Sequence, residues 1–414
     1  MPPKKIVKPI KTSDDPDVST SQEYFNLTKE YEEKYGKKTI VLMQVGAFFE
    51  VYGVKNEETE NITHSNIVEF SNVCQMNIAE KKISYGNDSK VVMAGFRDFA
   101  FDKYISILTN AGFTVPVFIQ HKLEKGIVRK LDRVYSTGTF LSYDADSCTR
   151  ITNNIMCIWI ETYKVPANTN KMIVYGAAVV DIFTGKSSIF QHEMPFYLNT
   201  TTFDELEKFV SIYEPSETIL LSSFEQHDLN TIIQYIGLNT NVIHKIALNE
   251  EKAVKCGTQK YVKHVLTEFF GEESYDICSE FWSNSMATQA FCYLLNFIQE
   301  HNPDLVRKIG LPEFNNTSHR LILANHTLAQ LNIIASDGHG QYSSVLSLLN
   351  KCCSAMGKRK FQHQLTNPTF DEVWLQQEYD ITNHMLLPDC YSLVELFRKQ
   401  LRQMRDIEKI SRQL

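Results

Sequence analysis

The period of the hydrophobic pattern changes near residue 255, and this change limits the folds that the chain can adopt. Before it, short apolar runs alternate with amphipathic stretches, and residues 155–160 and 173–183 are apolar on both faces, as buried central strands are. After it, apolar residues recur at helical spacing through 287–300, 371–387 and 391–414. The pattern predicts a multidomain protein that combines α/β domains with an all-α region.

Composition narrows the class of protein further. At 414 residues, with 43% hydrophobic and 22% charged residues, the chain is long enough for several globular domains. Its formal net charge of −7 gives no sign of nucleic-acid binding, so such a partner would have to meet a local basic face. Nine cysteines without a C-x-x-C pair indicate reduced thiols. The chain has neither an apolar run of about 18 residues nor the apolar core of a secretory signal, which predicts an intracellular protein that does not enter a membrane.

Shifts in composition divide the chain into five parts. Residues 1–20 are rich in Pro, Lys, Ser and Asp and are predicted to form a disordered tail. Strand and helix signals mix over 21–142, which predicts a small α/β domain. A predicted linker, 143–150, leads to a second α/β domain over 151–254. Residues 255–414 end inside an amphipathic pattern without a Gly or Pro stop, so we expect a truncated helical domain of a longer protein.

The segment 46–53 carries the most unusual chemistry in the chain. It follows an apolar run that is typical of a strand. Side chains two residues apart on an extended segment lie on the same face, so Phe48 and Glu50 are predicted to point the same way. An aromatic ring beside a carboxylate suits the interrogation of a stacked base, whereas a Phe at a strand end most often belongs to the core. Phe49 and Val51 alternate to the other face and are the better core candidates.

A local basic stretch lies farther along the first α/β domain. Two interpretations are open. The cations contact DNA phosphates, which position a protein without specifying sequence, or they form a solvated strand face. The candidates for contact with the DNA backbone are Lys122, Lys125, Arg129, Lys130 and Arg133, interrupted by Glu124 and Asp132.

Several segments follow one another in an order that is specific when taken together. They are 45–50, 94–96 with the helical pattern after it, 129–139, 177–185, and 328–334 with 344–346 and 356–359. In this order they resemble the MutS family of DNA mismatch-repair proteins over nearly the whole chain after the tail, and the first is similar to the family's Phe-x-Glu motif. The chain departs from the family at Ala47, where an acid is usual, at Thr137, where a Pro is usual, and at 96–99, which replaces a Pro- and His-containing stretch. These departures favour a divergent branch such as that of the large DNA viruses.

The resemblance implies a fold and a recognition chemistry. The fold would be a mixed-sheet α/β mismatch-recognition domain, a ribonuclease-H-like α/β connector and the start of a helical core or lever domain. Phe48 would wedge against a mispaired or unpaired base of double-stranded DNA, where the base step is cheaper to open, and Glu50 would hydrogen-bond that base. Because a carboxylate is repelled by ordinary duplex, Glu50 would also act against the wrong substrate.

The resemblance also implies an ATP-dependent dimeric clamp, but the chain does not contain the residues for that activity. It has no G-x-x-x-x-G-K-[ST] motif, and we expect no catalytic residues, cofactor or metal site within it. ATP and Mg are expected only in a C-terminal part beyond this chain. A homodimer in the full-length protein and a MutL-like partner are further implications of the resemblance.

Two alternatives belong to other functional classes. A metal-dependent nuclease would use Asp181 in the second, ribonuclease-H-like domain, but two-metal hydrolysis needs several convergent carboxylates and none is predicted on the neighbouring strands. A protein-interaction scaffold that has lost DNA binding would keep the same fold. Cleavage that disappears with Asp181→Asn would support the nuclease, and equal binding of mismatched and matched duplexes would support the scaffold.

Overall fold

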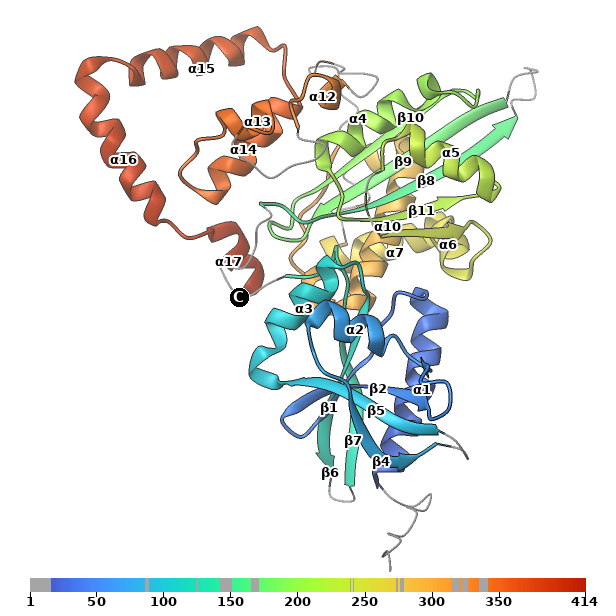
Figure 1. Ribbon diagram of the computed structural model, residues 1–414. Coiled ribbons are helices and arrows are strands. Elements are labelled where there is room, and N and C mark those ends of the chain that lie inside the picture. Colours follow the sequence, from blue (N-terminus) through green and yellow to red (C-terminus); the bar gives the residue numbers. More distant parts are fainter. Residues whose placement is uncertain are drawn as a thin grey trace, which may run out of the picture. The chain divides into compact units, whose positions relative to one another are not determined.

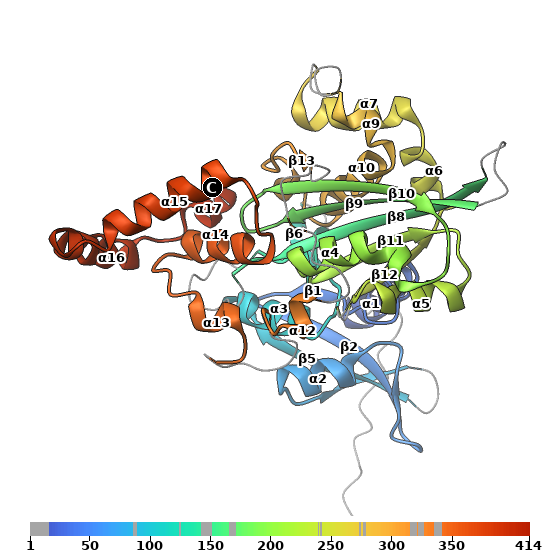
Figure 2. The same cartoon turned by 90° about the horizontal axis from the view of Figure 1, so that it is seen from above.

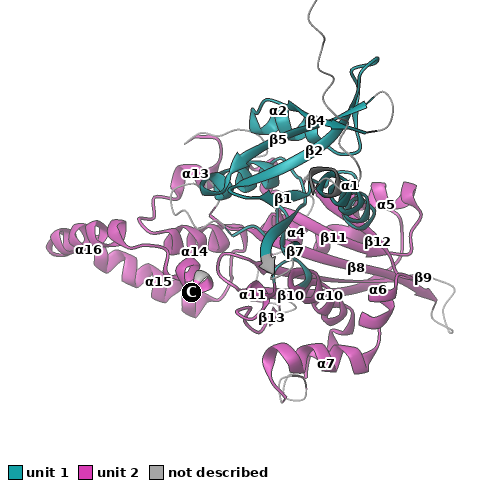
Figure 3. Cartoon of the chain, turned by 90° about the horizontal axis from the view of Figure 1, so that it is seen from below, with its two compact units in different colours: residues 1–147, 300–302 teal, residues 148–299, 303–414 magenta. Residues whose placement is uncertain are grey.

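The computed structural model describes residues 16–85, 89–123, 126–141, 151–164, 171–238, 240, 242–272, 275, 279–314, 321, 327–334 and 342–414. The chain forms two compact units (Figure 3). Unit 1 comprises residues 1–147 and 300–302, and unit 2 comprises residues 148–299 and 303–414. Each unit contains its own β-sheet, and helices accompany both sheets, so the prediction of mixed α/β sheets plus helices is confirmed.

Unit 1 is built on a seven-stranded sheet (Figure 1). Its elements are α1 (Pro16–Tyr35), β1 (Leu42–Val45), β2 (Phe48–Asn56), β3 (Ile62–Thr63), α2 (Ile67–Cys74), β4 (Ala79–Ser84), β5 (Ser89–Arg97), the 3₁₀ helix η1 (Asp98–Ala100), α3 (Phe101–Asn110), β6 (Val115–Leu123) and β7 (Gly126–Tyr135). The strand order is β4-β5-β2-β1-β6-β7, with β3 paired to β2 beside this path. All of these pairings are antiparallel except that of β1 with β6.

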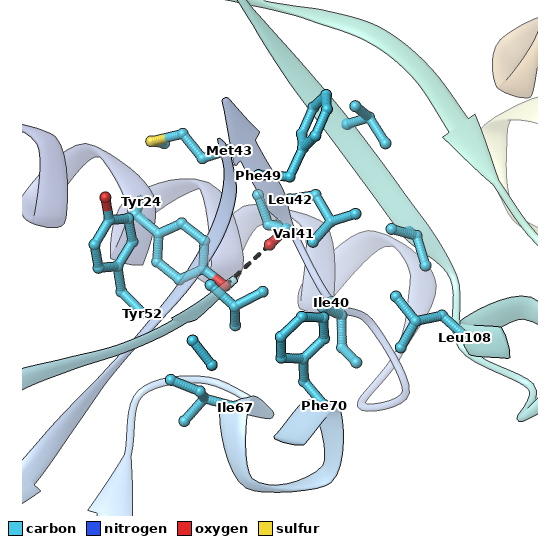
Figure 4. Packing of buried hydrophobic residues seen from close by; sticks show 14 of the residues in the cluster. Tyr24, Ile40, Val41, Leu42, Met43, Phe49, Tyr52, Ile67, Phe70 and Leu108 are labelled. Carbon is cyan, nitrogen blue, oxygen red and sulfur yellow. Dashed lines mark hydrogen bonds between the residues drawn. The ribbon is translucent and has the colours of Figure 1, made fainter. Parts of the chain in front are cut away.

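Helices pack on both faces of this sheet. Side chains alternate along its strands, so each face presents its own set of residues to a helix. On one face α1 packs against β2, with the ring centroids of Tyr24 and Tyr52 5.1 Å apart. On the other face Phe49 of β2 meets Phe101 of α3, with ring centroids 4.8 Å apart. The Tyr24 hydroxyl donates a hydrogen bond to the Val41 carbonyl inside this core (Figure 4). The two faces of β2 therefore belong to two different packing layers.

Unit 2 is built on a six-stranded sheet with two helices packed on one of its faces. Its elements up to residue 247 are β8 (Asn154–Lys164), β9 (Lys171–Asp181), β10 (Ser187–Pro195), the 3₁₀ helix η2 (Thr200–Phe203), α4 (Asp204–Tyr213), β11 (Glu217–Ser222), α5 (Gln226–Tyr235) and β12 (Ile243–Ala247). Strands β8, β9 and β10 form an antiparallel meander, whereas β11 runs parallel to both β8 and β12. The buried face of the meander packs against α4 and α5.

The central strands of unit 2 are buried on both faces, which confirms the prediction for residues 155–160 and for 173–183 except at Val174. The second face is covered by α10 (Ser285–His301), which Figure 2 shows across the sheet from α4 and α5. Gly176 of β9 permits this packing. A Cβ atom at Gly176 would lie 2.3 Å from the Ala287 backbone nitrogen, so any larger residue would push helix and sheet apart.

Helices make up most of the described chain beyond residue 255, as predicted, with turns and loops between them. This region also adds β13 (Glu313–Phe314), a two-residue strand that pairs in parallel with β10. The remaining elements are α6 (Glu251–Cys256), α7 (Gln259–Phe270), α9 (Glu280–Ser283), α11 (Pro303–Val306), α12 (Thr327–Gln330), α13 (Val345–Leu349), α14 (Ala355–Thr366), α15 (Glu372–Met385), the 3₁₀ helix η3 (Pro388–Cys390), α16 (Tyr391–Gln403) and α17 (Ile407–Gln413).

Residues 391–414, where apolar residues recur at helical spacing, form two helices and not one, because the structure separates α16 from α17 at residues 404–406. Asp406 explains the break. Its carboxylate accepts a hydrogen bond from the Lys409 backbone amide at 3.2 Å, which caps the new helix, and also binds the Arg359 guanidinium at 2.6 Å. A capping side chain competes with continuation of the helix. The spacing of apolar residues alone gives no sign of such a cap.

Two predicted segments lie largely outside the described residues. Of the predicted tail only residues 16–20 are described, and there α1 has already begun at Pro16. The predicted linker at 143–150 falls wholly outside them. Within the part of the chain that the structure describes, no helix combines the length and apolar character that a bilayer crossing requires.

Candidate nucleic-acid interface

The hairpin between β1 and β2 presents Phe48 at the start of β2. The two strands pair through Val45 and Phe48, and Gly46 and Ala47 form the turn. Gly46 has φ +62°, a conformation that glycine adopts without strain, and its backbone amide donates to the Gln120 side chain at 2.9 Å. A tight turn tied to β6 therefore fixes the backbone on which the Phe48 side chain stands.

Phe48 is partly exposed and has a cation above its ring. The residue is 39% exposed, whereas Phe49 and Val51 are buried, as the alternation predicts. Arg97 lies opposite Phe48 in the pairing of β2 with β5, and its guanidinium carbon is 5.6 Å from the ring centroid. This distance permits a cation–π interaction, so an exposed positive charge accompanies the exposed ring.

The segment that follows β5 is fixed against the same turn. The Asp98 backbone amide donates to the Ala47 carbonyl at 3.0 Å. The Asp98 carboxylate in turn accepts from the Phe99 backbone amide at 2.8 Å. The Phe99 side chain is 83% exposed, an unusual position for so large an apolar group. Two exposed aromatic side chains and one cation thus belong to two backbone segments that are hydrogen-bonded to each other.

Glu50 lies in a different environment from Phe48, although both side chains belong to the same face of β2. Glu50 is only 7% exposed. Its Oε2 atom accepts hydrogen bonds from the Tyr52 hydroxyl and from Lys81 Nζ, the latter at 3.2 Å. Lys81 Nζ also lies 4.5 Å from the centroid of the Tyr52 ring. The acid next to the exposed aromatic ring is therefore held in a small buried cluster, which we call the Glu50 cluster (Glu50, Tyr52 and Lys81).

The predicted basic stretch does not form one continuous face in the described residues. Lys125 lies outside them, and so does the side chain of Lys122. Arg129 is largely buried. Its Nη1 atom pairs with Glu23 of α1 at 3.2 Å and its Nε atom donates to the Gln44 carbonyl at 3.2 Å. Arg129 thereby connects α1, β1 and β7.

A bulge in β7 separates the remaining cations of this stretch from Arg129. Val117 pairs with Arg133 and Phe118 with Leu131, so Asp132 is an extra residue on β7. Because the extra residue reverses the alternation, Lys130 and Arg133 share one face and Arg129 points to the other. Lys130 is exposed and Arg133 is partly exposed. Contact of these cations with DNA stays a prediction.

Three residues of this region were missed by sequence reasoning. Arg97 and Phe99 belong to 96–99, a departure from the family pattern that could have drawn attention to them. Lys81 gives no comparable signal, because it is 31 residues from Glu50 in sequence and only the register of three strands brings the two side chains together.

Asp181 of unit 2 serves a structural purpose. It is 9% exposed and accepts hydrogen bonds from the Asn153 amide at 3.0 Å, the Phe183 amide at 3.1 Å and the Thr184 hydroxyl at 2.8 Å. Burial raises the pKa of its carboxyl group above the ordinary range, against the effect of these hydrogen bonds. No group of three or more His, Cys, Asp or Glu side chains placed to hold a metal ion occurs among the described residues.

Comparison with known proteins assigns both ends of the chain to one class. The family model of MutS domain I matches residues 20–144, which contain the hairpin and the Glu50 cluster. The model of MutS domain III matches residues 326–414, in the helical region of unit 2. The chain belongs to the MutS family.

Relatives of known name match most of the chain. A putative DNA mismatch repair protein mutS homolog of Acanthamoeba polyphaga mimivirus is 26% identical over 422 residues, which cover 94% of this chain and 36% of that protein. The DNA mismatch repair protein MutS of Fusobacterium nucleatum is 24% identical over 400 residues, covering 95% and 40%. The mitochondrial mutS homolog of Sarcophyton glaucum is 25% identical over 413 residues, covering 86% and 39%. The chain spans about two fifths of the length of these relatives, one of which comes from a large DNA virus.

Proposed function

We propose that this chain recognises mispaired or unpaired bases in double-stranded DNA, as part of DNA mismatch repair, and that Phe48 is the recognising side chain. The observation that carries the proposal is the partly exposed Phe48 ring on a tight hairpin of the region that matches MutS domain I. An apolar side chain that enters between base steps kinks the duplex at a cost of a few kcal/mol per step. A mispaired base is already weakly held, so that cost falls and Phe48 can select for it.

Glu50 supplies a second criterion in this proposal. It stands two residues behind the wedge on the same face of β2, where the phosphates of an undistorted duplex would repel a carboxylate. A displaced base offers N–H groups that can hydrogen-bond the carboxylate and offset the repulsion. Glu50 would therefore weaken binding to matched duplex more than binding to a mismatch.

Cations near the hairpin would hold the DNA backbone. The chain has a net charge of −7, so binding requires a local positive surface. Arg97 beside Phe48 and the shared face of Lys130 and Arg133 supply such charges, and we keep Lys122 and Lys125 as further candidates. Arg129 is the least suited of the predicted contacts, since Glu23 and Gln44 already engage its guanidinium.

The proposal extends to the rest of the chain and to a longer protein. We infer that residues 151–254 form a ribonuclease-H-like connector and that residues from 255 onward begin the helical lever. The meander of β8 to β10 followed by the parallel β11 supports the first assignment, and the match to MutS domain III supports the second. For a longer protein we propose an ATP and Mg site and most of the homodimer contacts in a C-terminal part beyond this chain, and a MutL-like protein as a partner.

The test is a titration of labelled duplexes that are identical except for one mismatch or one unpaired base. Fluorescence anisotropy is measured with the 414-residue chain at about 200 mM salt, where phosphate-only binding is weak. We expect the wild type to prefer the mismatched duplex. Phe48→Ala should erase that preference, because loss of aromatic stacking on one base costs about 1–3 kcal/mol.

A matched control removes an aromatic ring of equal exposure elsewhere. Tyr163 of β8 in unit 2 is also 39% exposed, so Tyr163→Ala should leave the preference unchanged. Circular dichroism of both variants confirms that they are folded. The proposal is wrong if the wild type binds matched and mismatched duplexes equally, which would favour the interaction scaffold, or if Phe48→Ala keeps the preference.

A further inference from the structure

Lys81 occupies a position that a surface lysine does not normally take. Its side chain is 22% exposed and that of Glu50 is 10% exposed, so their ion pair is largely withdrawn from water. The Lys81 ammonium lies 3.2 Å from both Glu50 Oε2 and the Tyr52 hydroxyl oxygen. In another lysine pair of the same sheet, Lys55 with Glu80, the lysine side chain is 28% exposed but the carboxylate is 52% exposed. The two pairs therefore differ mainly in the burial of the acid.

The fold of β4 places Lys81 on this face. Ala79 pairs with Met93, which in turn pairs with Tyr52, so Ala79 and Tyr52 share a face. Lys81 follows Ala79 by two residues and therefore points the same way. The pairing of β4 with β5 becomes irregular immediately after Glu80, where the strand is free to bring the Lys81 stem towards Glu50.

We propose that Lys81 is a positioning residue that neutralises Glu50, so that DNA meets a Glu50–Lys81 pair rather than an isolated carboxylate. This inference rests on the proposed function, in which Glu50 faces the displaced base. Lys81 then sets how strongly Glu50 repels matched duplex, and a displaced base binds the carboxylate in competition with the ammonium and the Tyr52 hydroxyl. A lysine that acted on DNA directly would instead contribute independently of Glu50.

A double-mutant cycle separates these two roles of Lys81. Matched and mismatched duplexes are titrated with the 414-residue chain in wild-type, Lys81→Gln, Glu50→Gln and doubly substituted forms. In Lys81→Gln the uncompensated Glu50 should weaken binding to matched duplex roughly tenfold and to mismatched duplex less, so the preference rises. In the Glu50→Gln background the same lysine substitution removes only an unpaired positive charge, so it should weaken both duplexes alike and leave the preference unchanged.

Matched controls show whether the effect belongs to the pair. Lys81→Arg keeps the charge and should retain wild-type binding. Lys82 is the exposed neighbour on β4, so Lys82→Gln removes an equal charge one residue away and should not raise the preference. Thermal unfolding followed by circular dichroism identifies any variant that does not fold. If Lys81→Gln is such a variant, Lys81→Met takes its place in the cycle, because its unbranched apolar side chain also lacks the charge and preserves the packing of the lysine stem.

The outcomes distinguish this inference from the proposed function itself. If the wild type prefers a mismatch but Lys81→Gln weakens matched and mismatched duplex by the same factor in both backgrounds, Lys81 contacts phosphate directly and the inference fails while the proposed function stands. In that case the salt dependence of binding should also decrease by about 0.9 in logarithmic slope. If the wild type shows no preference for a mismatch, the proposed function fails.

Discussion

Two buried carboxylates, Glu50 in unit 1 and Asp181 in unit 2, show why burial alone does not identify a functional acid. Both are less than a tenth exposed. The hydrogen-bond donors to Asp181 are two backbone amides and the hydroxyl of the nearby Thr184. The donors to Glu50 are the ends of two side chains, the Tyr52 hydroxyl and the Lys81 ammonium.

The nature of the donors decides what each acid can do. A backbone amide cannot turn away without local unfolding of the main chain that contains it. The Asp181 carboxylate is therefore held by the amides of Asn153 and Phe183 as long as the unit is folded. A side-chain donor can rotate about its own torsions, and a ligand can take its place. Glu50 can therefore change partners at little cost to the fold, which is what recognition of a base requires, whereas Asp181 cannot supply a free carboxylate to a catalytic metal.

The largest effect that tests this comparison is the loss of stability in Asp181→Ala. Removal of the carboxylate leaves two backbone amides and one hydroxyl without their buried acceptor, so we expect a loss of about 3–5 kcal/mol in the free energy of unfolding. The three tryptophans, Trp159, Trp282 and Trp374, all belong to unit 2, so urea unfolding followed by tryptophan fluorescence reports on that unit. Mismatch preference, measured below the onset of unfolding, should not change.

A surface acid gives the control for Asp181. Asp132 is the exposed extra residue of the β7 bulge, and Asp132→Ala should change stability by no more than about 0.5 kcal/mol. The distinction between the two acids breaks down if Asp181→Ala is as stable as the wild type, or if it abolishes a metal-dependent cleavage of DNA that the wild type performs.

Hydrogen-bond partners also distinguish two cations of β7, Arg129 and Lys130. The expected change in stability is the next largest. Arg129 donates to a backbone carbonyl and pairs with Glu23, so Arg129→Gln should destabilise unit 1 by about 1.5–3 kcal/mol. Lys130 is exposed, so Lys130→Gln should leave stability unchanged and lower the logarithmic salt slope of DNA binding by about 0.9 if it contacts one phosphate. Urea unfolding followed by circular dichroism measures the stability, and anisotropy titrations at several salt concentrations measure the slope. If Lys130→Gln destabilised unit 1 and Arg129→Gln lowered the salt slope instead, the structural role and the DNA-contact role would have to be exchanged.

Much of unit 1 could be predicted from sequence because its signals are local. Alternation along β2 is enough to assign Phe49 and Val51 to the core and Phe48 to the other face. The engagement of Arg129 could not be predicted, because one extra residue at Asp132 reverses which face each cation of β7 takes. The Glu50 cluster was out of reach for a related reason, since it depends on the register of β4, where the pairing is irregular.

In unit 2 the division between local and long-range signals is similar. Continuous apolar runs indicated the buried strands β8 and β9, and helical spacing indicated the region after residue 255. The break before α17 was not predicted because the Asp406 cap that causes it is held by a residue distant in sequence. Arg359 of α14 binds both Asp406 and Glu408. These two ion pairs stabilise the conformation in which α17 begins after Asp406.

A smaller effect is expected when Glu50 loses its charge. Glu50→Gln should strengthen binding to matched duplex by roughly fivefold, or about 1 kcal/mol, because the negative member of the Glu50–Lys81 pair is removed and the Lys81 charge is left to attract the phosphates. Binding to a mismatch should change less, so the preference falls. Asp181→Asn is the matched substitution in unit 2 and should leave both affinities unchanged. Titration of both duplexes with both variants checks the prediction, and a Glu50→Gln chain with undiminished preference would contradict it.

The smallest effect concerns the pH dependence of stability. Burial raises the folded-state pKa of Asp181 despite its hydrogen bonds and the nearby charges of Arg359 and Arg412. The folded chain therefore takes up this proton at a higher pH than the unfolded chain does. The contribution of Asp181 to stability must rise as pH falls through the folded-state pKa, and it levels off below the unfolded value of 3.8.

Asp406 provides the opposite sign in the same unit. Burial opposes ionisation of Asp406, but the hydrogen bonds from Arg359 and the Lys409 amide, together with the charges of these two residues, outweigh it and lower the pKa. Its stabilising contribution is present above the unfolded pKa and is lost as pH falls through the folded one. Urea unfolding of wild type, Asp181→Asn and Asp406→Asn between about pH 2 and 7 should show that the wild type gains on the first variant as pH falls and, below about pH 4, loses its advantage over the second. If the stability difference between wild type and variant changed with pH in the same direction for both acids, the opposite pKa shifts of Asp181 and Asp406 would be contradicted.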